Sequence, residues 1–223
     1  KKYRLHTKIV LVTTAFLLLS GTLLFYIIEY NNTMKGMNVG ERILASLFSA
    51  TTARTAGFNS VDTGSLTSAS KLLTCVLMFI GGSPGSTAGG IKTTTIFILV
   101  VSLWSGITNR HKTAVFKRRF EDDAIKKAST VFTLNMFLAI FALFTILAIT
   151  DLSLSDVMFE VFSAIGTVGM TTGITRDLSS AARIIIMVLM FCGRVGSLSF
   201  ALTFLQGKKD PPVYYPEEEI SVG

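Results

Sequence analysis

Two short segments of the sequence combine threonine, glycine and an apolar residue in the same order. Each is a Thr-X-Gly-apolar tetrapeptide, and together they comprise Thr55, Ala56, Gly57 and Phe58, and Thr167, Val168, Gly169 and Met170. Glycine permits backbone conformations that turn carbonyl oxygens toward one axis, and rings of such carbonyls replace the hydration shell of an alkali cation. Neither segment carries a carboxylate, which disfavours a hard divalent cation. The pair therefore predicts a carbonyl-lined ion filter, the alternative being two ordinary surface loops.

A third segment, GGSPGSTAGGIKTTT at residues 81–95, interrupts an apolar region with five glycines and a proline. Non-helical backbone at membrane depth must be buried in protein or line a water-filled path. A phosphate-binding loop is disfavoured because Ile91 separates Gly90 from Lys92, and a helix kink would need only one or two such residues. The interrupting loop comprises Gly81, Gly82, Ser83, Pro84, Gly85, Ser86, Thr87, Ala88, Gly89 and Gly90.

The elements that must position these segments are apolar helices. Half of the 223 residues are hydrophobic and only 16% are charged, against about 25% in a typical soluble domain. Residues 9–28 and 131–149 carry no charge, and residues 181–205 carry only Arg183 and Arg194. Each run is long enough to cross a bilayer, whereas residues 69–80 and 95–107 are too short to do so alone. The composition predicts an all-α membrane protein in contact with the lipid bilayer.

Lysine and arginine gather in three places: before the first span, between residues 110 and 127, and after the last span. Because cytoplasmic loops carry this excess, we expect a multi-pass protein of the cell membrane with both termini in the cytoplasm. The same bias explains the net charge of +7. Nucleic acid is therefore not an expected partner.

The order of elements repeats. A span, a short amphipathic helix, a Thr-X-Gly segment and a second span occur once in residues 1–112 and again in residues 113–223, which ends in a cytoplasmic tail. A re-entrant helix that runs inward points its negative dipole end at the membrane centre, where it attracts cations. We expect two pore-forming repeats, each with a pore helix and a filter segment.

Three ionisable residues at membrane depth need partners. Arg54 precedes the first filter segment and Glu160 lies within the second pore helix, so we predict that they pair and support the filter, with Asp62 as the competing partner of Arg54. Arg194 lies 25 residues after Gly169, and the glycine-rich loop begins 24 residues after Gly57. The matching depth predicts that Arg194 contacts the loop and acts as a latch on it.

The segments ARTAGFNSVD, GGSPGSTAGGIK, GTVGMTTGI and GRVG resemble those of the Ktr/Trk/HKT superfamily of potassium transporters, most of all the KtrB-type ion-translocating subunits. The resemblance covers the whole chain and corresponds to the C-terminal half, repeats three and four, of a pseudo-fourfold pore. It implies K+ binding at the filter residues and a gating function for the glycine-rich loop. It also implies two further repeats in an N-terminal half that is missing here.

The resemblance further implies a homodimer, a cytoplasmic KtrA-like nucleotide-binding regulatory ring, and Na+ as a possible activator. The expected activity is potassium uptake without covalent chemistry or a covalent cofactor. Two alternatives remain: a secondary transporter that binds a small solute at broken helices, and a subunit of a tetrameric cation channel.

Overall fold

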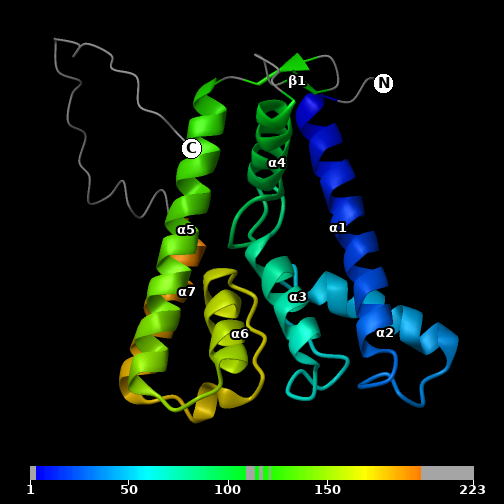
Figure 1. Ribbon diagram of the computed structural model, residues 1–223, viewed down its shortest axis with the longest axis vertical. Coiled ribbons are helices and arrows are strands. Elements are labelled where there is room, and N and C mark those ends of the chain that lie inside the picture. The colour runs from blue at the N-terminus through cyan, green and yellow to red at the C-terminus, as the bar shows by residue number, and fades with distance from the viewer. Residues whose placement is uncertain (1–3, 109–113, 116–117, 121, 197–223) are drawn as a thin grey trace.

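The computed structural model describes residues 4–108, 114–115, 118–120 and 122–196 (Figure 1). Its helices are α1 (Leu5–Glu29), α2 (Val39–Thr52), α3 (Ser68–Phe79), α4 (Thr93–Ile107), α5 (Asp122–Ile149), α6 (Leu154–Ile165), the 3-10 turn η1 (Ile174–Arg176) and α7 (Ser180–Val195). A hairpin of two short strands, β1 (Ala114–Val115) and β2 (Arg118–Arg119), precedes α5. The C-terminal tail and part of the basic central loop lie outside the described residues.

Two helices of the described chain, α1 and α5, are long and apolar enough to cross a membrane. Both present large apolar side chains to their surroundings, among them Leu19 and Phe144, which are 72% and 74% exposed. Exposed apolar surface on this scale is typical of a lipid-facing or subunit-facing helix. The second span of the first repeat is broken as predicted, since α3 has 12 residues and α4 has 15.

The helices α2 and α6 are the short elements that follow the first span of each repeat. Figure 1 shows them in the lower half of the molecule, beside rather than along the full length of α1 and α5. Each begins at a polar cap: Asn38 and Glu41 form a reciprocal capping box on α2, and Ser153 accepts a hydrogen bond from the Asp156 N–H on α6. An acidic first turn complements the positive N-terminal dipole of each helix.

The two repeats share their cores. One buried cluster lies mainly in the second repeat but includes Phe79 and Ile91 from the first. The other lies mainly in the first repeat but includes Phe159, Val168 and Met170 from the second. Phe79 also makes an edge-to-face contact with Phe162, their ring centroids 5.4 Å apart. Because each core cluster includes side chains from the other repeat, the two repeats pack as one body around the predicted filter segments.

Two buried charged residues, Lys71 and Glu29, connect the elements at the end of the molecule where the pore helices begin. Neither was singled out in the sequence. Lys71 of α3 forms an ion pair with Asp156 of α6 at 2.8 Å, which joins the two repeats. Glu29 is fully buried at the end of α1 and accepts hydrogen bonds from the N–H and hydroxyl of Thr67, the N-cap residue of α3. This carboxylate therefore lies at the positive end of the α3 dipole.

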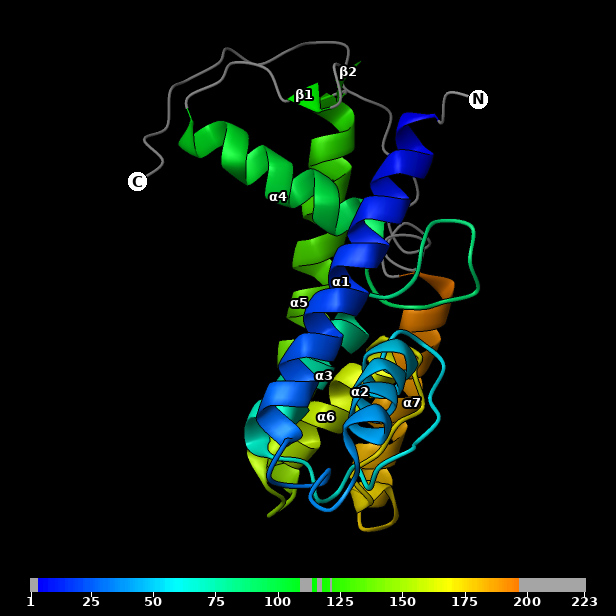
Figure 2. The same cartoon turned by 90° about the vertical axis from the view of Figure 1, so that its right-hand side faces the viewer.

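The helix α4 departs from the direction of its neighbours. Figure 2 shows it inclined to α5, and the segment that joins α3 to α4 projects near the far end of α7. This segment is the glycine-rich loop, and its position brings it to the site described next.

Candidate functional site

The first filter segment begins two residues after the C-cap of α2, Ala53. Thr55 and Gly57 have positive φ angles of 70° and 79°, whereas Ala56 between them does not. In a regular strand successive carbonyls point to opposite sides, and left-handed residues at alternate positions break that pattern. A β-branched residue with positive φ is rare and strained, and such strain is concentrated at functional sites.

The second filter segment repeats this backbone. Thr167 and Gly169 have φ angles of 52° and 85°, again with a residue of ordinary φ, Val168, between them. Thr55 and Thr167 are the only non-glycine residues with positive φ in the described part of the chain. The sequence repeat therefore corresponds to a repeat of the same unusual conformation at the end of each pore helix.

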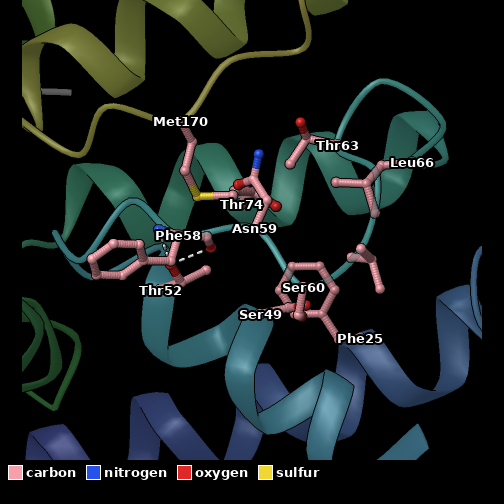
Figure 3. A pocket seen from close by; sticks show the side chains of 11 residues that line it. Phe25, Ser49, Thr52, Phe58, Asn59, Ser60, Thr63, Leu66, Thr74 and Met170 are labelled. Atoms are coloured by element: carbon pink, nitrogen blue, oxygen red, sulfur yellow. Dashed lines mark hydrogen bonds between the residues drawn. The ribbon is translucent and has the colours of Figure 1, made fainter.

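A pore-helix side chain anchors the first filter segment. The Thr52 hydroxyl accepts a hydrogen bond from the Phe58 N–H at 2.7 Å and donates one to the Phe58 carbonyl at 2.6 Å (Figure 3). The Phe58 carbonyl is thus turned toward the pore helix and cannot face an ion. The carbonyls of this segment that are predicted to face the ion are therefore those of Thr55, Ala56 and Gly57. A small cavity of about 10 Å³ lies behind the segment, with Met170 on its wall.

The two filter segments meet directly. The Val168 carbonyl oxygen lies so close to the α-carbon of Gly57 that a side chain at position 57 would overlap it. Beyond the filter, the Thr63 hydroxyl donates a hydrogen bond to the Thr171 carbonyl. Met170 is 5% exposed and packs into the core cluster that is mainly of the first repeat.

The predicted ion pair between Arg54 and Glu160 is wrong. Glu160 is buried and accepts hydrogen bonds from the hydroxyls of Thr171 and Thr175 in its own repeat. Arg54 instead donates to the Gly81 carbonyl at 3.2 Å. The competing partner, Asp62, is also wrong, because its carboxylate accepts from Ser65 and from the Gly64 N–H. Glu160 therefore ties its pore helix to the chain after the filter, and Arg54 ties the other filter to the loop.

The glycine-rich loop has closely spaced ends. The Gly81 N–H donates to the Ile91 carbonyl at 2.9 Å, and the Ile91 N–H donates to the Phe79 carbonyl at 3.0 Å. The Thr93 N–H donates to the Gly82 carbonyl and so extends the same pairing. The segment is an Ω-type loop inserted into an otherwise continuous span.

Side chains from other elements hold this loop at three points. Arg54 donates to the Gly81 carbonyl, the Gly89 N–H donates to the Thr167 hydroxyl at 2.9 Å, and the Arg194 guanidinium donates to the Thr87 carbonyl. Lys92, the N-cap residue of α4, also donates to the Ala88 carbonyl of the loop. The structure thus places Arg194 against the loop, at the residue depth expected from its spacing to Gly169.

A cavity of about 690 Å³ runs along the second repeat, between Arg176 and Arg194. Its lining includes Glu160, Thr167 and Gly169 as well as Arg176 at one end and Arg194 at the other. A hollow of this size with a few convergent polar groups is typical of a binding site or a path. It passes the second filter segment and reaches the residue that contacts the loop.

Sequence reasoning missed Thr52, the Thr167 hydroxyl contact and the Lys71–Asp156 pair. Lys71 did carry a signal, since it is an ionisable residue within the apolar second span, and such residues are expected to have a partner. The contacts of the Thr52 and Thr167 hydroxyls carried none, because threonines are common in helix ends and loops.

Thr52→Val should destabilise the protein, because the isosteric methyl leaves both the Phe58 N–H and its carbonyl without their partner. Burying such unsatisfied groups costs about 1–3 kcal/mol. Thermal unfolding of the purified protein in detergent measures the change. Thr51→Val is the matched control, since the exposed Thr51 hydroxyl bonds only to Leu47 of its own helix. Equal losses in the two variants would contradict an anchoring function for Thr52.

Two span–pore helix–span units, each ending its pore helix in a left-handed Thr-X-Gly segment, define an all-helical membrane protein with pore-forming repeats. The profile of the TrkH family, described as a cation transport protein, matches residues 5–210. The chain belongs to the TrkH family of cation transport proteins, a family of transporters rather than enzymes.

The chain is 36% identical over its whole length to "Ktr system potassium uptake protein B" of Bacillus subtilis and 38% identical to "Potassium/sodium uptake protein NtpJ" of Enterococcus hirae. It spans 50% and 51% of these two proteins, so it has about half the length of the curated relatives it matches. The fold matches the potassium transporter TrkH from Vibrio parahaemolyticus with a TM-score of 0.71 at 18% identity, over 87% of this chain and 43% of that one.

Proposed function

We propose that the chain forms two of the four repeats of a potassium-conducting pore, with residues 1–112 and 113–223 as the repeats. The matched left-handed backbone of Thr55–Gly57 and Thr167–Gly169 carries this proposal. Two filter segments in one conformation, each at the C-terminal end of a pore helix, present carbonyl oxygens and negative dipole ends to a shared axis. The absence of carboxylates from both segments favours a monovalent cation.

The glycine-rich loop is the proposed gate of this pore. It is held against one filter segment through Gly89 and Thr167, and against α7 through Thr87 and Arg194. A loop in this place obstructs the path beneath the filter, and the Arg194 charge repels a cation that approaches it. Both effects stabilise the closed state, so Arg194 acts as a latch.

Arg194→Ala should raise the maximal rate of potassium uptake and leave the apparent affinity for potassium nearly unchanged. A charge-assisted hydrogen bond contributes about 1.5–3 kcal/mol, so its loss shifts a closed–open equilibrium about tenfold or more toward the open state. Uptake of potassium or rubidium by cells without their own potassium transporters measures the rate.

Arg183→Ala is the matched control for this variant. Arg183 lies on the same helix but donates to the Arg176 carbonyl at 2.7 Å and makes no hydrogen bond to the loop in the described chain. An Arg194 variant of normal abundance whose maximal uptake equals that of the Arg183 variant would reduce Arg194 to a packing residue.

A complete pore on this scheme needs partners. We propose that two further repeats close the ring around the filter and that the pore assembles as a homodimer in the cell membrane with both chain termini in the cytoplasm. A cytoplasmic nucleotide-binding ring and activation by Na+ complete the proposal. The names of the Ktr relatives describe those proteins as parts of potassium uptake systems, which supports further subunits. The homodimer, the nucleotide-binding ring and the activation by Na+ rest on the resemblance of the sequence motifs alone.

The test is electrogenic uptake. Membrane vesicles that contain the chain and the two further repeats should take up potassium in response to an imposed membrane potential, without a co-substrate and without a proton or sodium gradient. Uptake that requires a proton or sodium gradient, or accumulation of an organic solute instead of potassium, would identify a secondary transporter and overturn the pore.

A further inference from the structure

One end of the loop is hydrogen-bonded to the second filter segment, and the other end to the residue directly before the first filter segment. Arg54, directly before the first filter segment, donates to the Gly81 carbonyl at the start of the loop. Near the end of the loop, the Gly89 N–H donates to the hydroxyl of Thr167, the first residue of the second filter segment. A displacement of the loop near Gly89 therefore breaks a hydrogen bond to the filter itself.

The contact at Thr167 is close-packed. A β-carbon at Gly89 would lie 2.6 Å from the Thr167 methyl carbon and 2.9 Å from its β-carbon. Only glycine fits here, because nothing in this contact is the far end of a flexible side chain. The loop backbone thus lies directly against a filter side chain, with no intervening residue.

Thr167 also has a backbone that needs support. Its φ angle of 52° is unfavourable for a β-branched residue and persists only where surrounding contacts hold it. The hydrogen bond from Gly89 is one of those contacts. It fixes the side chain from the loop side while the Thr167 N–H is bonded to the Ala164 carbonyl of the pore helix at 3.0 Å.

The equivalent residue of the first repeat differs. Thr55 has the same left-handed backbone, with a φ angle of 70°, but its hydroxyl makes no hydrogen bond to the loop within the described ranges. The two threonines therefore offer a matched pair, of which only one is joined to the loop by its side chain.

We infer that Thr167 is a positioning residue that couples the loop to the filter, so that the ion affinity of the filter depends on whether the loop is in place. With the loop closed, the Gly89 N–H occupies the Thr167 hydroxyl and stabilises the left-handed backbone of the second filter segment. With the loop displaced, the hydroxyl is released toward the ion path and the segment loses that support. This inference rests on the proposed function, since it assigns the mechanism by which gate and filter communicate.

A double-mutant cycle tests the coupling. Thr167→Val and Thr55→Val are each made with the loop intact and with residues 83–90 deleted, in the complete pore. The readouts are the maximal rate and the apparent potassium affinity of uptake. Loss of one neutral hydrogen bond shifts an equilibrium about two- to tenfold. The effect of Thr167→Val on the potassium affinity should be two- to tenfold larger with the loop intact than with residues 83–90 deleted. Thr55→Val should have the same effect on the affinity in both backgrounds.

Thr167→Ser provides the rescue, because it keeps the hydroxyl and should restore the affinity of the parent protein. If the effects of Thr167→Val and of the loop deletion simply add, and the parent protein transports potassium normally, the coupling is overturned and the proposed pore stands. A parent protein that shows no potassium uptake would instead count against the pore itself. If Thr167→Val lowers abundance, Gly89→Ala perturbs the same contact from the loop side and should shift affinity in the same direction.

Discussion

Gly57→Ala should reduce the selectivity for potassium over sodium by about tenfold or more, which corresponds to about 1.4 kcal/mol of discrimination. Two costs act together at this position. The φ angle of 79° is unfavourable for an alanine by about 1–2 kcal/mol, and the new methyl group would overlap the Val168 carbonyl oxygen of the other filter segment. Relief of that overlap moves a carbonyl that we propose to face the ion. Competitive uptake of labelled potassium against sodium measures the ratio.

Two other glycines separate these costs. Gly169 has a φ angle of 85°, but a methyl group added there would meet no atom of the described chain within 4 Å, so within this chain Gly169→Ala should impose strain without displacement of a neighbour and reduce selectivity less. Gly36 has a φ angle of 92° and equally open surroundings, but lies in the loop between α1 and α2. Gly36→Ala should leave selectivity unchanged. The same selectivity in all three variants would contradict the filter assignment.

Deletion of residues 83–90 should raise the maximal potassium flux several-fold and make it less dependent on a cytoplasmic regulator, because the obstruction beneath the filter is removed. The loop ends lie close together, but Ile80 and Ile91 pair in parallel, so a direct join of Gly82 to Ile91 requires this short pairing to rearrange. Gly81 and Ile91 are already hydrogen-bonded to one another, and Thr93 is bonded to Gly82. The deletion removes the contact with Arg194 but keeps the Arg54 bond to Gly81.

Two measurements make this deletion decisive. Abundance in the membrane and thermal stability must match those of the parent protein, so that flux reports the pore and not the amount of protein. A stable deletion variant with no flux would show that the loop is part of the conducting path, and the gate proposal would fail.

Much of the architecture could be predicted from the sequence because it depends on local composition. Hydropathy located α1 and α5, and the short apolar runs on either side of the glycine-rich loop predicted the break between α3 and α4. The positions of the two Thr-X-Gly segments followed from the repeat. Their shared left-handed backbone at the two threonines was not predicted, because at Thr167 it also depends on the distant contact with Gly89 of the loop.

The partners of the charged residues could not be predicted in the same way. Arg54 and Glu160 have opposite charges and lie near the two filter segments, yet each bonds to a different partner, a backbone carbonyl in one case and two hydroxyls in the other. The sequence cannot indicate which backbone carbonyl will accept a hydrogen bond, because every residue has one. Arg194 was placed correctly against the loop because its depth could be counted along two helices of known direction.

The ion pair between Lys71 and Asp156 has a consequence for the biogenesis of the protein. The two residues are separated by 85 positions, and ribosomes add about 5–20 residues per second. The α3 segment therefore enters the translocon with an unpaired lysine and stays so for several seconds, until the second pore helix has been synthesised. During that interval the Lys71 ammonium has no Asp156 partner, so the cost of placing its charge near the membrane is offset only when the second pore helix arrives.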